Sequence, residues 1–135
     1  MKVAPEGFTE VRLVDPFELH VGPAFSQGEA GARRYAFQVE AHHCNLRGVV
    51  HGGMLMTLAD MTLGQAVWDV TDRAPSVTLN MQHQFIKSVK EGDWIEVVPE
   101  LTRRTRAFVF MRGDFTVNGE IVMTTSSVWK LLGQD

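Results

Sequence analysis

The sequence predicts an α+β domain in which one curved antiparallel sheet wraps around a single long, buried helix. A run of almost continuously apolar residues predicts that helix from about Gly53 to about Val70. The segments that follow alternate apolar and polar side chains, as half-buried strands do. The dipeptide Asn118-Gly119 is a strong hairpin signal between two of them. Curling one antiparallel sheet around the helix is the simplest way to bury it.

Length and composition indicate one domain, residues 1–135, with enough chain to bury a core. The apolar content of 44% and charged content of 21% are those of an ordinary soluble globular protein. A net charge of −3 gives no reason to expect binding to nucleic acid or to an anionic membrane surface. The single cysteine, Cys44, excludes an internal disulfide. No signal peptide and no membrane span are recognised, so we expect a cytoplasmic protein.

The first half of the chain is expected to lead into the helix. Residues 1–30 are rich in glycine and proline, and we expect a lead-in with at most a short helical turn near Pro16–His20. Residues 33–40 alternate from Tyr35 onward and predict a strand. Residues 48–53 form a loop, after which the helix begins. Because that helix is apolar nearly all round, it should be surrounded by protein.

The second half of the chain is expected to be three or four antiparallel strands. Strict alternation predicts the first of them over Val77–Gln82, and Phe85-Ile86 can extend it. A turn at Glu91–Asp93 precedes the next strand. The later strands are expected at residues 94–101, 107–117 and 120–131.

Residues 45–60 carry the candidate chemistry. Asn45 and His51 lead into Gly52 and Gly53 at the start of the helix, and Asp60 lies in the middle of its apolar run. A helix N-terminus presents unpaired N–H groups and the positive end of the helix dipole, so it can stabilise a developing negative charge. A lone carboxylate in an apolar segment is costly unless it has a partner or a function. The stretch therefore offers an oxyanion site together with an acid, base or nucleophile.

The pattern Asn45-x-x-Gly48-x-x-His51-Gly52-Gly53, with Asp60 nine residues after His51, resembles the hotdog-fold acyl-CoA thioesterases of the PaaI type. The related 4-hydroxybenzoyl-CoA thioesterases are similar. The resemblance covers roughly residues 17–132, including the strand after the helix and the Asn118-Gly119 hairpin. It implies a hotdog fold and hydrolysis of a fatty or aryl acyl-CoA. Coenzyme A is then part of the substrate, and no separate cofactor is implied.

The resemblance also implies a role for each polar residue. The backbone N–H of Gly52 would bind the thioester carbonyl oxygen, and Asp60 would act as nucleophile or as general base for water. Asn45 and His51 would orient the thioester or the water, and Thr78 would assist Asp60 from the adjoining strand. Members of this family are dimers or pairs of dimers, in which each site is built from two subunits.

The spacing of two of these residues independently favours a dimer. Gly52 and Asp60 are eight residues apart, which is about 12 Å along one helix. A reacting carbon must lie within about 3 Å of both groups, so one helix cannot supply both to one substrate. Two antiparallel helices across a twofold axis can. The small or polar residues Gly53, Thr57 and Gly64 share the helical face of Asp60 and would permit close approach there.

Structural roles remain open for several of these residues. Local hydrogen bonds can satisfy Asp60, His51 and Asn45 can brace the loop, and threonine is common in strands for packing reasons alone.

Substrate contacts are expected from Gly53 and from the basic run Arg103, Arg104 and Arg106, which suits the phosphates of coenzyme A. The alternative for that run is a solvated surface turn. A metal site is not expected, because His42, His43, Cys44 and His51 match no zinc spacing. In a continued strand, His42 and His43 would also point to opposite faces.

Two alternative functions are kept. An acyl-thioester dehydratase or hydratase would use a histidine and a carboxylate to move protons at a carbon–carbon double bond. A non-catalytic acyl-CoA-binding protein would have the fold without the chemistry. The helix carboxylate after His51-Gly52-Gly53 favours hydrolysis over the first, and the intact candidate residues argue against the second.

Overall fold

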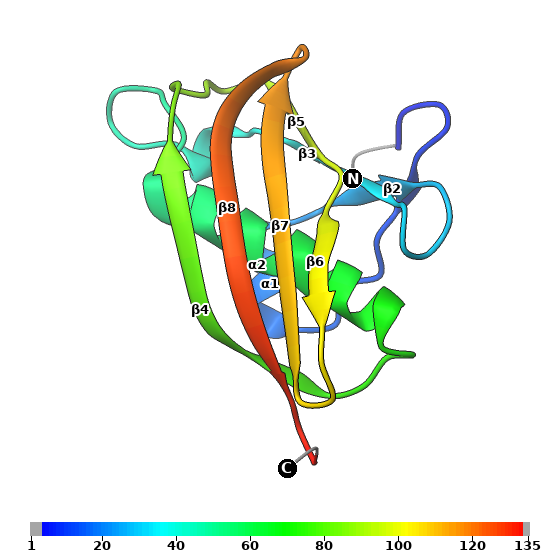
Figure 1. Ribbon diagram of the computed structural model, residues 1–135. Coiled ribbons are helices and arrows are strands. Elements are labelled where there is room, and N and C mark those ends of the chain that lie inside the picture. Colours follow the sequence, from blue (N-terminus) through cyan, green and yellow to red (C-terminus); the bar gives the residue numbers. More distant parts are fainter. Residues whose placement is uncertain (1–3, 134–135) are drawn as a thin grey trace.

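The computed structural model describes residues 4–133 and has one sheet curved around a central helix, α2 (Gly52–Val70). Figure 1 shows α2 crossing behind β4, β8, β7 and β6. The sheet has eight strands in the order β1-β2-β3-β5-β7-β8-β4, with β6 paired to β7, and all pairings are antiparallel. The strands are β1 (Thr9–Glu10), β2 (Phe25–Gln27), β3 (Arg34–Gln38), β4 (Ser76–Phe85), β5 (Trp94–Val97), β6 (Glu100–Arg104), β7 (Phe108–Val117) and β8 (Glu120–Leu131). The α+β prediction is confirmed.

The inner face of the sheet and one side of α2 form the core. Leu58, Ala59, Leu63 and Val67 of α2 are almost completely buried among strand residues such as Phe115. The opposite side of the helix is different, because Met56 and Asp60 are exposed. The expectation that α2 would be surrounded by protein is therefore wrong for the single chain, which leaves one face of the helix open.

The lead-in contributes more structure than its glycines and prolines predict. The expected helical turn is present as α1 (Pro16–Val21), which starts at a proline, the residue best suited to the first turn. The prediction of nothing further in residues 1–30 is wrong, since β1 and β2 extend the sheet. These strands are only two and three residues long, too short for an alternation pattern.

Most strand boundaries after the helix agree with the sequence. The Asn118-Gly119 hairpin is confirmed, with positive φ at both residues (51° and 79°), as a two-residue I′-type turn requires. Five strands follow the helix where three or four were expected, because the predicted strand 94–101 is interrupted at Val98-Pro99. Proline has no N–H to donate to a strand ladder, which accounts for the break between β5 and β6.

Strand β4 forms one end of the sheet and pairs only with β8 among the described strands. Its apolar residues Val77, Leu79 and Phe85 are 44%, 53% and 53% exposed. A ten-residue edge strand with apolar side chains invites pairing with another chain unless something covers it. Within residues 4–133, no helix combines the length and apolar character that crossing a membrane requires.

Candidate active site

His51 organises the start of α2. It is the N-cap, and its Nδ1 accepts the N–H of Gly53 at 2.8 Å. Its carbonyl oxygen accepts the N–H groups of Met54 (2.8 Å) and Leu55 (3.2 Å). His51 thus satisfies the amides of Gly53 and Met54, which a helix N-terminus otherwise leaves unpaired, and its carbonyl accepts the first regular helical bond from Leu55. The His51 ring therefore lies against the backbone of the helix start and caps it.

The amide of Gly52 is the one left over. Within the described part of the chain, no acceptor lies within hydrogen-bonding distance of Gly52 N–H. A side chain at Gly52 would meet only the ring of Phe85, at an ordinary contact distance of 3.8 Å. Gly52 therefore has an exposed aromatic ring as its neighbour, and its unpaired amide lies at the positive end of the helix dipole. This arrangement suits an anion or a polarised carbonyl oxygen.

The amide of Gly53, by contrast, is occupied by His51. A Cβ at this position would lie 3.0 Å from His51 Nδ1, which is closer than a side chain normally tolerates. Glycine at this position therefore lets the histidine cap approach the helix. The N–H of Gly53 is therefore not available for the substrate contact that the sequence predicts.

Asp60 meets Thr78, as the sequence analysis expected. The Thr78 hydroxyl on β4 donates to Asp60 Oδ1 on α2 at 2.7 Å. Asp60 itself lies on the open face of the helix. A carboxylate held by one donor retains lone pairs for a second interaction. The pair is therefore ordered by the protein and accessible from outside it.

The lead-in forms a wall over this carboxylate. Asp60 lines two adjoining hollows of about 310 and 280 Å³. Asp15, the residue before α1, and Glu18 of α1 line both of them. Burial, followed by the nearby charges of Asp15 and Asp60, raises the pKa of Glu18. The surroundings of Asp60 are therefore acidic on the α1 side and apolar on the side of Met61.

Asn45 braces the loop before the helix. Its Oδ1 accepts the N–H of Arg47 at 2.9 Å, and its own N–H donates to the carbonyl of Val49. The Gly48 N–H donates to the Asn45 carbonyl, and Gly48 has a left-handed φ of 77°. These bonds give Asn45 the structural role that the sequence left open, although they do not use its side-chain amide nitrogen.

The basic run lies at the other end of α2 from Gly52. Arg104 donates from Nη1 to the carbonyl of Val70, the last residue of the helix, at 2.7 Å. Arg103 ends the same exposed strand, and Arg106 lies in the turn that follows. One of the three arginines is therefore used to cap the helix C-terminus.

Gly64 lines the same hollow as Asp60, on the helical face where the sequence placed it with Gly53 and Thr57. A Cβ there would lie 3.2 Å from the indole of Trp129 on β8. This glycine therefore makes room for a tryptophan of its own chain. Thr57, on the same face, donates its hydroxyl back to the carbonyl of Gly53.

Glu40, His42 and His43 place their side-chain ligand atoms within 4.8 Å of one another. The strand does not continue through these residues, because Ala41–His43 forms a 3₁₀ helix. His42 and His43 therefore do not point to opposite faces, and their ring centres lie 4.0 Å apart. His43 Nδ1 accepts the N–H of Glu40 (2.9 Å), and its Nε2 donates to the carbonyl of Val21 (2.7 Å). Both nitrogens of His43 are thus used, and this buried ring has no lone pair for a metal.

Two neighbours of the site were missed in the sequence. Phe85 contacts Gly52 from the end of β4, and Glu18 approaches Asp60 from the lead-in. Phe85 was recognised only as a strand extension, and no local signal in residues 1–30 indicates a wall over the helix. Both contacts join segments that lie more than thirty residues apart.

Comparisons with known proteins agree with this architecture. A family profile described as the thioesterase superfamily matches residues 47–124. The chain is 30% identical over 133 residues to a Pseudomonas aeruginosa protein named as an esterase, covering 97% of this chain and 99% of that protein. It is 28% identical over 79 residues to acyl-coenzyme A thioesterase 13 of Mus musculus, covering 58% of this chain and 56% of the mouse protein.

A solved structure shares the fold. It is a variant of the phenylacetic acid degradation protein PaaI from Thermus thermophilus, with a TM-score of 0.78 and 25% identity. The match covers 87% of this chain and 100% of the PaaI chain. The hotdog fold expected from the sequence is confirmed.

Proposed function

Because this chain belongs to the thioesterase superfamily, we propose that it hydrolyses a fatty or aryl acyl-CoA to the free acid and coenzyme A. The names of two relatives, an esterase and an acyl-coenzyme A thioesterase, support hydrolysis of an acyl thioester. A thioester suits the candidate site, because its carbonyl is electrophilic and its thiolate leaves readily. One carboxylate and one oxyanion donor can then suffice without a catalytic triad.

The observation that carries the proposal is the separation of two prepared groups on α2. His51 occupies its neighbours' amides and leaves Gly52 N–H free, while Thr78 holds Asp60 on the open helix face. The two groups are eight residues, or about 12 Å, apart along the helix. Each is therefore half of a site that a second subunit would complete.

The open surface of the chain supports a dimer that brings these halves together. The unpaired edge of β4 carries the exposed side chains Val77, Leu79 and Phe85, and Met56 is exposed on the adjacent face of α2. Exposed apolar side chains on a strand edge and on a helix face are both suited to a twofold, self-complementary contact. In such a dimer, Gly52 of one subunit faces the partner's Asp60.

The proposed reaction uses water and the groups of the chain, with no cofactor. The thioester carbonyl oxygen accepts the Gly52 N–H, which stabilises the negative charge that develops there. Asp60 then removes a proton from water as the water oxygen attacks the carbonyl carbon. The intermediate collapses with cleavage of the C–S bond, and the thiolate recovers the proton. Direct attack by Asp60, followed by hydrolysis of the resulting anhydride, uses the same geometry.

Substitution of Asp60 by asparagine tests the proposal. Asp60→Asn preserves the shape of the side chain and should lower kcat for acyl-CoA hydrolysis by about 10²–10⁴-fold. The oligomer, measured by gel filtration with light scattering, should be unchanged. Release of coenzyme A is followed with a thiol reagent over short, long and aromatic acyl groups.

Hydrolysis by Asp60→Asn at the wild-type rate contradicts the assigned role. Hydration of enoyl-CoA by the wild-type protein, without hydrolysis, favours the hydratase alternative. Binding of acyl-CoA without turnover favours the non-catalytic one.

A further inference from the structure

A groove of about 680 Å³ lies along the C-terminal half of α2, between the helix and the lead-in. Its lining includes Arg12, Arg33, Arg73, Gln65 and Trp68, and we call it the arginine groove. Arg12, Gln65 and Trp68 also line the 280 Å³ hollow that contains Asp60. The arginine groove therefore adjoins the hollow that contains Asp60.

Among the residues that the structure describes, two cations of the arginine groove have no ion pair. Its carboxylates are Glu10 and Asp69, and Asp69 is already bound by Arg33 at 3.0 Å and by the Tyr35 hydroxyl at 3.2 Å. Within residues 4–133, neither Arg12 nor Arg73 has an ion pair with a carboxylate (Arg73 lies over an aromatic ring). Both guanidinium groups are thus available to an anion in the groove.

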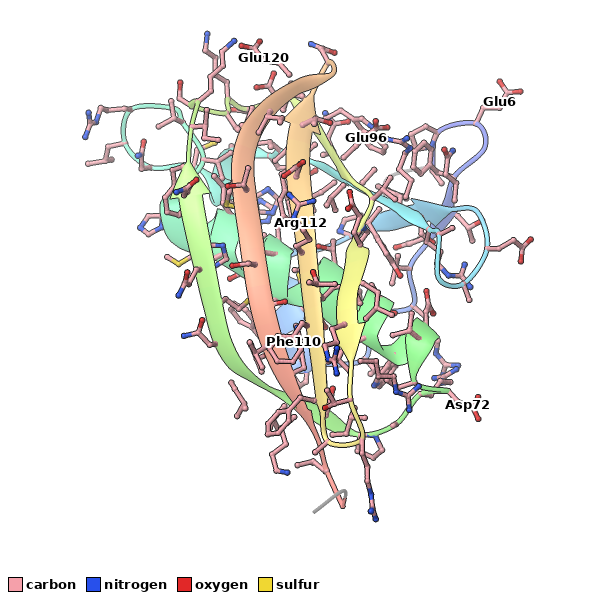
Figure 2. The ribbon with its side chains drawn as sticks, in the orientation of Figure 1. Glu6, Asp72, Glu96, Phe110, Arg112 and Glu120 are labelled. Carbon is pink, nitrogen blue, oxygen red and sulfur yellow. The ribbon has the colours of Figure 1, made fainter. Side chains whose placement is uncertain are left out.

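Arg73 has an unfavourable backbone conformation, and its guanidinium lies against Trp68. Asp72 and Arg73 follow α2 with φ of 53° and 63°, in the left-handed region that glycine normally fills at helix ends. Figure 2 shows Asp72 at this end of the helix. The Arg73 N–H donates to the carbonyl of Trp68 at 2.9 Å, and its guanidinium carbon lies 5.0 Å from the Trp68 ring centre. Strain of this kind is characteristic of functional positions.

The distance between the arginine groove and Asp60 matches the length of a pantetheine arm. Trp68 follows Asp60 by eight residues of α2, which is about 12 Å. From the thioester sulfur to the first phosphate oxygen of coenzyme A, the arm has about a dozen bonds. Four extended residues have the same number and span about 14 Å. An extended arm that starts at Asp60 therefore reaches the level of Trp68, over which the Arg73 guanidinium lies.

We propose that the arginine groove binds the phosphates of the nucleotide end of coenzyme A, with Arg12 and Arg73 as the principal contacts. This inference rests on the proposed function and changes one of its details. It assigns the phosphates to this groove and not to Arg103, Arg104 and Arg106. Arg104 already caps the helix, whereas Arg12 and Arg73 lie in a groove that reaches the carboxylate.

Paired substrates test the assignment. An acyl-CoA is compared with the N-acetylcysteamine thioester of the same acid, which has the same reacting bond and lacks the phosphates. Arg12→Ala and Arg73→Gly should each raise KM for acyl-CoA about fivefold with kcat unchanged. KM for the short thioester should stay at the wild-type value. Arg73→Gly should remain folded, because glycine is favoured in this backbone conformation.

Three further variants serve as comparisons. Arg112→Ala is a control for loss of one positive charge, because Arg112 pairs with Glu100 and Asp114. Figure 2 shows Arg112 on the face of the sheet that is turned away from α2. Arg103→Ala and Arg106→Ala test the alternative phosphate site. The assignment is overturned if these two raise KM for acyl-CoA while the groove variants do not, or if the groove variants affect both substrates equally.

Direct binding separates this inference from the proposed hydrolysis. Isothermal titration of free coenzyme A into wild-type protein should give a Kd that increases about fivefold in Arg73→Gly and partly recovers in Arg73→Lys. That result supports the groove even if neither thioester is hydrolysed, in which case only the proposed reaction fails. If both thioesters are hydrolysed but Kd is the same in all variants, the groove assignment fails and the reaction stands.

Discussion

Thr78 donates its hydroxyl to Asp60 across 2.7 Å, and this bond joins the edge strand β4 to the middle of α2. It depends on a bulge at Leu79, where Thr78 is paired with Trp129 and Asn80 with Val128. Because of the extra residue, Thr78 shares a face with Trp129, and Met81 shares the same face with Ser127. Strict alternation would have turned one of Thr78 and Met81 away from the helix.

Removal of the Thr78 hydroxyl should slow the reaction. Thr78→Val keeps the shape of the side chain but leaves Asp60 without its donor. A hydrogen bond to a charged group contributes about 1.5–3 kcal/mol, so we expect kcat to fall about 10- to 150-fold. Thr78→Ser retains the hydroxyl and should keep most of the activity. Steady-state kinetics on one acyl-CoA compares the two, and equal rates for them would argue that the bond is only structural.

Removal of the Gly52 N–H should be possible without unfolding the helix. Proline is favoured at the first position of a helix, and His51 before it has an extended backbone (φ −61°, ψ 134°) that tolerates a following proline. Gly52→Pro should lower kcat by about 10²–10³-fold through loss of the oxyanion donor. Gly52→Ala is the matched variant, because it keeps the N–H and meets only the Phe85 ring. Circular dichroism should show the same helix content in both.

Mixed oligomers should recover activity if the site is shared between subunits. A heterodimer of Asp60→Asn and Gly52→Pro chains has one site with both groups intact and one with neither. Random 1:1 reassociation gives heterodimers as half of the population, so about a quarter of the wild-type activity should return. Differently tagged chains, purified as a pair, make the measurement direct. Inactive, folded heterodimers would mean that each subunit carries a complete site.

Glu18 should make stability depend on pH. Its pKa is raised above the ordinary 4.5 by burial and by the charges of Asp15 and Asp60, so the folded state disfavours ionisation of this carboxyl. The unfavourable contribution is absent below pH 4.5 and develops fully as pH rises through the folded pKa. Glu18→Gln should therefore raise Tm at pH 7 and leave it unchanged near pH 3.5. An equal increase in Tm at both pH values would mean that the substitution acts through packing and not through the charge of Glu18.

Local patterns were sufficient for the elements that carry the site. The apolar run of α2, the Asn118-Gly119 turn and most strand boundaries follow from periodicity and turn chemistry, which act over a few residues. The spacing of Gly52 and Asp60 also fixes their separation, because helix rise is constant. Residues 1–30 were the exception, since β1 and β2 are too short for a period and are ordered by the strands beside them.

By itself, the sequence determined a long apolar helix, an antiparallel sheet and a motif whose two halves lie about 12 Å apart. Only the tertiary structure decided which groups are available within that motif. His51 occupies the amide of Gly53 and leaves that of Gly52 free, and the bulge at Leu79 brings Thr78 to Asp60. The arginine groove likewise gathers residues from distant segments. These contacts depend on strand register and chain packing, which residue spacing along one element does not specify.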